Sequence, residues 1–236
     1  MKIVEQFLTL QGEGKYLGVP SYFIRSTGCN LRCEWIEENG TTTKCDTPYT
    51  SWSPEKGEEL NLNELLKKDE LKLVRHIVIT GGEPCINKDL PDIVNELIDN
   101  GYHITVETNG TIYHPNMSKA FMSISPKLSS SYPTTDEKAG QIHSHNNNFF
   151  ESVSKWIISN DYEVKFVINN REDIDKVIGL QSLLGFPDDK VYLMPQGITQ
   201  QQLNERGRWL FDECIKLNYR FTPRLHIDLF GNKRGI

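Results

Sequence analysis

Gly28-Cys29-Asn30-Leu31-Arg32-Cys33 opens the stretch that decides the architecture of this chain, and Cys45-Asp46-Thr47-Pro48-Tyr49 continues it after residues 34–44. Three of the five cysteines in the chain therefore fall within 17 residues. Three thiolates can bind three irons of a cubane [4Fe-4S] cluster and leave the fourth iron open to a ligand that is not protein. The spacing of Cys29, Cys33 and Cys45 predicts such a cluster.

Three clustered cysteines have two other common uses. A closed structural zinc site needs four ligands, and no histidine or fourth cysteine lies within residues 28–52. A disulfide would join two of the three thiols and leave one over. An iron with a vacant position can instead bind the amino and carboxylate groups of S-adenosylmethionine (SAM) and pass an electron into its sulfonium, with the protein supplying orientation. We therefore expect SAM as a second cofactor.

A second motif follows a predicted buried strand at residues 74–80. The strand runs into Gly81-Gly82-Glu83-Pro84, where two glycines allow the backbone to approach a bound molecule closely. Glu83 offers a carboxylate to the amino group of SAM. Cys85, which comes next, and Cys214 are expected to be buried apolar fillers, because the fourth iron has to stay open.

Composition excludes several classes of function. The 236 residues carry a formal net charge of −6, which argues against a nucleic-acid surface and favours a small-molecule substrate. No apolar run approaches the roughly 18 residues of a membrane span, and the first residues lack a secretion signal. An odd number of cysteines, clustered at one end, fits a reducing compartment. We expect a cytoplasmic enzyme.

Predicted strands alternate with predicted helices along the chain. We expect an extended lead-in at 2–10, strands at 20–26, 74–80, 102–107, 120–124, 163–168, 191–194 and 219–230, and helices at 62–70, 89–100, 149–159, 171–184 and 199–217. Polar or glycine-rich motifs repeatedly follow a strand, which is typical of an α/β barrel with its site at the carboxyl ends of parallel strands. The helices are too few for eight units. The sequence therefore predicts a partial, TIM-like α/β barrel in one domain, residues 1–236.

Two polar segments interrupt this pattern. Residues 34–44 contain a turn signal, Asn39-Gly40, and are expected to bulge into solvent while Cys45 keeps its role. Residues 128–148 are expected to form a mobile lid or surface loop, in which His143 and His145 are solvated.

Several of these motifs together resemble one enzyme family. Gln11-Gly12-Glu13-Gly14, the run from Phe23 to Cys33 and Cys45–Tyr49 resemble 7-carboxy-7-deazaguanine synthases, which are radical SAM enzymes of 7-deazapurine biosynthesis. The family usually has two residues between the second and third cysteines, where this chain has residues 34–44. A longer loop costs only about 1–2 kcal/mol of closure entropy.

The resemblance implies a reduced barrel, a homodimer and a lyase reaction. In that reaction 6-carboxy-5,6,7,8-tetrahydropterin becomes 7-carboxy-7-deazaguanine with loss of ammonia, started by the radical that SAM releases. A reductase such as flavodoxin or ferredoxin would supply the electron, and neither nucleic acid nor membrane is expected as a direct partner.

The resemblance also assigns ligands to residues. The expected SAM contacts are Asp46, Gly82, Glu83, Glu107, Ser125, Pro126, Lys127 and Gln196, and the expected pterin contacts are Leu10, Gln11, Gly12, Glu13, Arg25, Thr80, His226 and Ile236. Thr47 matches the family's Mg²⁺ position, and its hydroxyl is the hard oxygen ligand that this ion prefers. Arg25 suits bidentate capture of the substrate carboxylate.

Two rival functions share part of these motifs. An activase of a glycyl-radical protein would carry the cysteines and the Gly-Gly-Glu-Pro run, but has no reason to combine them with Gln-Gly-Glu-Gly and Asp-Thr-Pro. A regulatory or binding protein could hold an iron–sulfur cluster without turnover.

Overall fold

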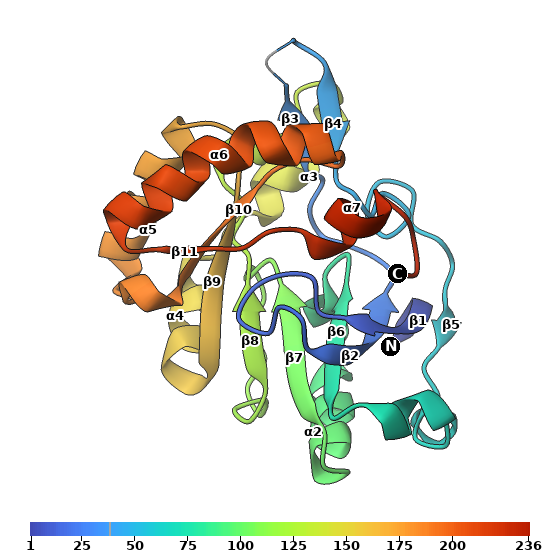
Figure 1. Ribbon diagram of the computed structural model, residues 1–236. Helices are drawn as coiled ribbons and strands as arrows, with labels where there is room; N and C mark the ends of the chain where they lie inside the picture. The colour runs from blue at the N-terminus through green and yellow to red at the C-terminus, as the bar shows by residue number, and fades with distance from the viewer. Residues whose placement is uncertain (38) are drawn as a thin grey trace.

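One open sheet organises the computed structural model, which describes residues 1–37 and 39–236 (Figure 1). Nine strands follow one another in the order β11-β10-β9-β8-β7-β6-β2-β1-β5. Their bounds are β1 Lys2–Leu10, β2 Pro20–Ser26, β5 Glu58–Glu59, β6 His76–Gly81, β7 His103–Thr108, β8 Phe121–Ile124, β9 Asp161–Ile168, β10 Val191–Pro195 and β11 Arg220–Phe221.

Seven consecutive strands of the sheet, β2-β6-β7-β8-β9-β10-β11, run parallel to one another. β1 is antiparallel to both of its neighbours, β2 and β5. The sheet ends at β5 and β11, so the barrel is partial, as predicted. Because all parallel strands end at the same edge, the segments that follow β2, β6, β7, β8, β9 and β10 come together there.

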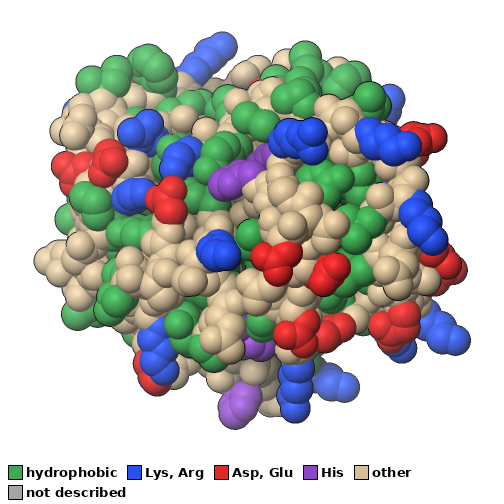
Figure 2. Space-filling model, turned by 90° about the horizontal axis from the view of Figure 1, so that it is seen from below, with side chains coloured by type: hydrophobic (Ala, Val, Ile, Leu, Met, Phe, Trp, Pro, Cys, Tyr) green, Lys and Arg blue, Asp and Glu red, His purple; other side chains and the backbone are tan. Residues whose placement is uncertain are grey.

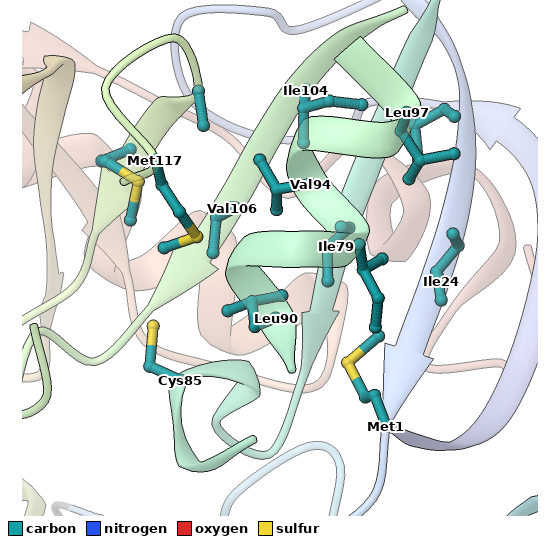
Figure 3. Packing of buried hydrophobic residues seen from close by; sticks show 14 of the residues in the cluster. Met1, Ile24, Ile79, Cys85, Leu90, Val94, Leu97, Ile104, Val106 and Met117 are labelled. Atoms are coloured by element: carbon teal, nitrogen blue, oxygen red, sulfur yellow. The ribbon is translucent and has the colours of Figure 1, made fainter. Parts of the chain in front are cut away.

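Helices cover the outer face of the sheet (Figure 1). They are α2 (Leu90–Asp99), α4 (Phe150–Ser159), α5 (Glu172–Leu184) and α6 (Gln200–Leu217). Figure 3 shows α2 packing Leu90, Val94 and Leu97 against strand residues such as Ile79 and Val106. Cys85 belongs to this apolar cluster and Cys214 to a second one between α5, α6 and β9–β10, as expected of fillers.

The C-terminal segment differs from the prediction. Residues 219–230 do not form one strand: β11 takes Arg220–Phe221, and α7 takes Leu225–Phe230. The alternation of apolar residues suggested a strand, but only Ile227 is buried in α7 while Leu229 is 62% exposed. The amide of Leu225 donates to the carbonyl oxygen of Gly12 (3.1 Å), which docks the helix on the segment after β1.

The two polar segments are also more ordered than predicted. Within the segment 34–44, β3 (Glu34–Ile36) and β4 (Thr42–Lys44) pair as a hairpin, with Trp35 and Thr43 buried. Residues 128–148 contain α3 (Glu137–Asn146), which Asp136 caps by accepting a hydrogen bond from the amide of Ala139 (2.9 Å). His145 is exposed, but His143 is buried against the carbonyl oxygen of Arg32 (2.6 Å), so the expectation of two solvated histidines is wrong for His143.

Elsewhere the differences are small. The helix predicted at 62–70 is only α1 (Leu62–Leu65), followed by a 3-10 turn at Asp69–Leu73. Figure 2 shows acidic and basic side chains interspersed on the lower face of the molecule. Within the described ranges, every helix is too short or too polar to cross a bilayer.

Candidate functional site

A cavity of about 660 Å³ lies at the carboxyl ends of the parallel strands. It is lined by Cys29, Cys33 and Cys45, by the segment after β1 and by the exits of β6 to β10. Every residue that the sequence analysis assigned to cluster, SAM, Mg²⁺ or pterin lines this cavity, except Glu83 and Pro126. Side chains from distant parts of the chain therefore meet in one place.

The hairpin β3–β4 explains how the longer cysteine spacing is accommodated. Glu34 pairs with Lys44 at its base, which sets Cys33 and Cys45 opposite each other. The amide of Cys45 donates a hydrogen bond to the carbonyl oxygen of Cys33 (3.1 Å). An antiparallel hairpin returns the chain to its starting point, so its length does not alter the separation of the two cysteines.

Gly82 lets the exit of β6 touch the cysteine loop. Its neighbour Gly28 has φ of +88°, a conformation that favours glycine, and the amide of Glu83 donates to the carbonyl oxygen of Gly28 (2.9 Å). A Cβ atom at Gly82 would lie 2.2 Å from the Gly28 oxygen and 2.7 Å from Cβ of Cys29. The close approach leaves no room for a side chain.

The three thiols suit an iron–sulfur cluster. Burial raises the pKa of Cys29 to about 12 and also raises the pKa of Cys33 and Cys45, so a thiolate here needs a bound cation such as iron. Within the described residues, no three Cys, His, Asp or Glu side chains converge on one metal-ion position. A cubane does not require that they do, because its three thiolates bind three different irons.

Glu83 does not line the cavity. Its buried carboxylate accepts hydrogen bonds from the amide of Asn109 (2.6 Å), the hydroxyl of Thr108 (2.8 Å) and the amide of Cys85 (2.9 Å). These hydrogen bonds hold the carboxylate against the exit of β7, and its contact with the amino group of SAM stays a prediction. Pro126 is likewise buried away from the cavity, between Ser125 and Lys127, which do line it.

The exits of β8 and β10 present polar atoms suited to a nucleoside ligand. The side-chain oxygen of Gln196, a residue only 3% exposed, has no hydrogen-bond partner among the described residues. The indole N–H of Trp35, on β3, has none there either. Lys127 donates to the hydroxyl of Ser125 (2.8 Å). Most buried polar groups in proteins have a hydrogen-bond partner, so these groups call for a bound molecule such as water or a ligand.

The segment after β1 forms the opposite wall. Glu107 accepts hydrogen bonds from the side chains of Thr80 (2.8 Å) and Gln11 (3.0 Å). Arg25 donates through Nε to Glu5 (2.8 Å) and lines the cavity. His226 on α7 packs so closely on Gly12 that a Cβ atom there would lie 3.0 Å from its Nδ1. Burial lowers the pKa of His226, which favours the neutral ring.

The sequence analysis missed two buried cations in the cavity. Lys165 on β9 donates to Glu13 (2.7 Å), and Arg224 donates to Glu13 (3.1 Å), to the carbonyl oxygen of Gly197 (2.7 Å) and to Asp46. Burial alone would raise the pKa of Glu13, but Lys165 and Arg224 outweigh it and hold that pKa well below its usual range.

A sequence signal existed for only one of the two. Lys165 lies between Val164 and Phe166 in the buried part of β9, and a charge inside a parallel strand needs a partner. Arg224 follows an exposed-looking turn, and its partners come from segments 27 to 211 residues away. Nothing local in the sequence marks it.

Thr47 and Asp46 lie beside the third cysteine. The Thr47 hydroxyl is 3.4 Å from Sγ of Cys45, and both residues line the cavity. Asp46 is partly engaged by its ion pair with Arg224, which holds its pKa below the usual range although burial would raise it.

Known proteins resemble this chain in sequence and in structure. Residues 23–123 match the Radical SAM superfamily. A 7-carboxy-7-deazaguanine synthase of Rhodopirellula baltica is 37% identical, with 99% of this chain and 88% of that protein covered. One from Halobacterium salinarum is 35% identical, covering 98% and 91%. The crystal structure of QueE from Escherichia coli superimposes with a TM-score of 0.65 at 29% identity, covering 95% of this chain and 94% of that one.

Proposed function

This chain belongs to the 7-carboxy-7-deazaguanine synthase family of radical SAM enzymes, and on that premise we propose that it converts 6-carboxy-5,6,7,8-tetrahydropterin to 7-carboxy-7-deazaguanine and ammonia. An enzyme of this family uses a [4Fe-4S] cluster and SAM in 7-deazapurine biosynthesis. The conversion balances as written, because substrate and product differ by one molecule of ammonia.

Cys29, Cys33 and Cys45 would hold the cluster, and their position together in the lining of one cavity supports this assignment. When bound, the cluster supplies the electron that cleaves SAM and starts the radical reaction. Gly82 would let SAM approach the backbone, while Ser125, Lys127 and Gln196 would contact its polar groups. The side-chain oxygen of Gln196, which has no hydrogen-bond partner in the part of the chain that the structure describes, supports this position, since it can accept a hydrogen bond from an amino group.

The pterin would lie against Leu10, Gln11, Gly12 and Thr80, opposite the cysteines. Gln11 and Thr80 both donate to Glu107, so three polar side chains are already oriented before a substrate enters. The Arg25 guanidinium, which donates through Nε to Glu5 and lines the cavity, would bind the substrate carboxylate. Glu13, His226 and Ile236 would complete the enclosure.

One observation carries the proposal. The cysteines of a radical SAM loop and the Gln11–Glu13 segment line the same cavity of about 660 Å³, although the strands that they follow, β2 and β1, run in opposite directions. A volume of this size is typical of pockets for small molecules. A binding protein without turnover has no need for this convergence.

Mg²⁺ and the remaining partners belong to the same proposal. The Thr47 hydroxyl would bind Mg²⁺, with water and substrate completing the octahedron and Asp46 supporting the site from beside it. We also propose that residues 1–236 form a single domain, that the enzyme is a cytoplasmic homodimer and that a flavodoxin- or ferredoxin-type reductase supplies its electron. The continuous sheet supports the single domain.

A single incubation separates this function from its rivals. Reduced, cluster-loaded protein is incubated anaerobically with SAM, Mg²⁺ and the carboxypterin, and the products are separated by chromatography. Formation of 7-carboxy-7-deazaguanine supports the synthase. Release of 5′-deoxyadenosine without that product would favour a glycyl-radical activase, and the absence of both would favour a cluster-bearing regulatory protein.

A further inference from the structure

We infer that the hairpin β3–β4 is a wall of the SAM pocket and that Arg206, through its ion pair with Glu37, is the positioning residue that holds this wall in place. The inference rests on the proposed SAM site and deepens it. It concerns the segment that departs most from the family's usual cysteine spacing.

Trp35 brings the hairpin into the cavity wall. Its side chain is buried, lines the cavity and packs with Leu31 and Cys33. The register pairs Trp35 with Thr43, which is buried on the same face, whereas Ile36 and Lys44 belong to the other face. On that face Ile36 is 49% exposed, and Lys44 lines the cavity from the base of the hairpin.

Arg206 joins the hairpin to the exits of β9 and β10. Buried on α6, it donates through Nε to the carbonyl oxygen of Asn169 (3.1 Å) and through Nη1 to that of Gln196 (3.2 Å). Its Nη2 donates to Glu37 on the hairpin. One guanidinium thus fixes the backbone of Gln196, which lines the cavity, relative to the strand pair that carries Trp35.

Two further contacts restrict the hairpin to this position. The second carboxylate oxygen of Glu37 accepts a hydrogen bond from the Thr43 hydroxyl across the strand pair (2.5 Å), and the side-chain amide of Asn169 donates to the carbonyl oxygen of Ile36 (3.1 Å). The Glu37 and Arg206 side chains are only 11% and 10% exposed. An ion pair with so little solvent contact is screened weakly and has a defined geometry, unlike a surface pair.

The consequence for SAM follows from geometry. If the pair is broken, the hairpin and Gln196 lose their common anchor, and a ligand that touches both walls binds more weakly. The cysteines keep their own constraint, because the hydrogen bond between Cys45 and Cys33 lies at the base of the hairpin, away from Glu37. The structure therefore separates SAM affinity from cluster loading.

The test measures SAM binding to cluster-loaded protein without turnover. Isothermal titration calorimetry is carried out anaerobically with the cluster in its oxidised state, in wild type, Glu37→Gln, Arg206→Gln, the double variant and Arg206→Lys. Arg208→Gln is the matched control, since Arg208 lies on the same helix and is exposed. Iron content and the KM for the carboxypterin are measured alongside.

We expect Kd for SAM to rise at least tenfold in either single variant, with iron content and the KM for carboxypterin unchanged. The double variant should be no worse than the poorer single variant, Arg206→Lys should recover part of the affinity, and Arg208→Gln should match wild type.

Unchanged SAM affinity in Glu37→Gln would overturn the inference, and so would a loss of affinity that only follows a loss of iron. If Arg206→Gln does not fold, Glu37→Gln decides, because it alters only the hairpin side of the pair. Failure of the proposed function is a separate result: wild type would then form no deazaguanine while its SAM affinity still depended on Glu37.

Discussion

The backbone amide of Cys45 donates a hydrogen bond to the carbonyl oxygen of Cys33, 3.1 Å away, across the base of an antiparallel hairpin. The two residues are separated by residues 34–44 in the chain but are neighbours in space. The cysteine pattern therefore has to be understood in three dimensions, with the hairpin as a side branch of the cluster loop.

Cys45→Ala is expected to abolish stable cluster loading, because two thiolates cannot hold the cubane. Anaerobic iron and sulfide analysis should find less than half of the wild-type content. Cys214→Ala is the control: it lies in the second apolar cluster, so it should keep its iron and lose about 1 kcal/mol of stability. Equal loading of wild type and Cys45→Ala would exclude Cys45 as a ligand.

Gly82→Ala is expected to disturb the cluster loop from a neighbouring strand. The new methyl group would overlap the Gly28 carbonyl and Cβ of Cys29, both of which are backbone or near-backbone atoms that cannot rotate away. We expect lower iron content and a loss of about 2–3 kcal/mol in the free energy of unfolding.

Gly179→Ala serves as its control. Gly179 lies inside α5, where a Cβ atom would meet nothing within 4 Å, so alanine should stabilise the protein by about 0.5–1 kcal/mol. Denaturant unfolding monitored by circular dichroism measures both changes. A Gly82→Ala protein with full iron and wild-type stability would contradict the close packing described here.

Lys165→Met should be strongly destabilising, since it leaves Glu13 without its closest cation, with a cost of about 3–5 kcal/mol. Adding Glu13→Gln removes the buried carboxylate, whose remaining cation is then Arg224, and should restore part of that loss. A double-mutant cycle by urea denaturation is expected to give a coupling energy of about 1–3 kcal/mol. Additive effects of the two substitutions would mean that the pair is not a unit.

His76 should make the protein less stable in mild acid. Burial, with a smaller effect of His103, lowers the pKa of His76 from 6.5 to about 4, so the folded protein keeps this ring neutral between those values. The unfolded chain binds a proton there and is favoured as the pH falls from 6.5 toward 4. The contribution to stability is thus complete above pH 6.5 and is lost through that window.

The comparison of wild type with His76→Asn at pH 7.0 and 5.0 tests this linkage. Urea midpoints should drop between the two pH values in both proteins, but less in the variant, because the ring hydrogen-bonded to Ser21 and Thr105 is gone. Equal drops would show that other groups cause the acid sensitivity.

Much of the architecture could be predicted because its signals are local. The β-branched run before Gly81 and the polar residues after each strand are enough to indicate a parallel sheet with a site at one edge. The secondary-structure predictions were wrong where tertiary contacts determine the local conformation. Leu225–Phe230 alternates like a strand but forms a helix docked on Gly12, and α3 has so few apolar residues that only the Asp136 cap marks it.

In the site, too, local motifs could be predicted from the sequence, whereas contacts between distant segments could not. The cysteines and Gln11–Glu13 are recognisable as motifs, and they do meet in the cavity. Glu83 was assigned to SAM from its neighbours in the sequence, which do not indicate the hydrogen bonds that hold its carboxylate against the β7 exit. Arg224 could not be found at all, since its role depends on three segments that only folding brings together.

Because Arg224 joins these distant segments, the cysteine loop is poorly suited to being transferred alone into another protein. Residues 28–52 grafted onto another barrel would bring Asp46 without its guanidinium, and the recipient would also lack the Gly197 carbonyl and Glu13 that hold the guanidinium in place. An engineer who wants to move this chemistry to a new scaffold must move four separate strand exits together.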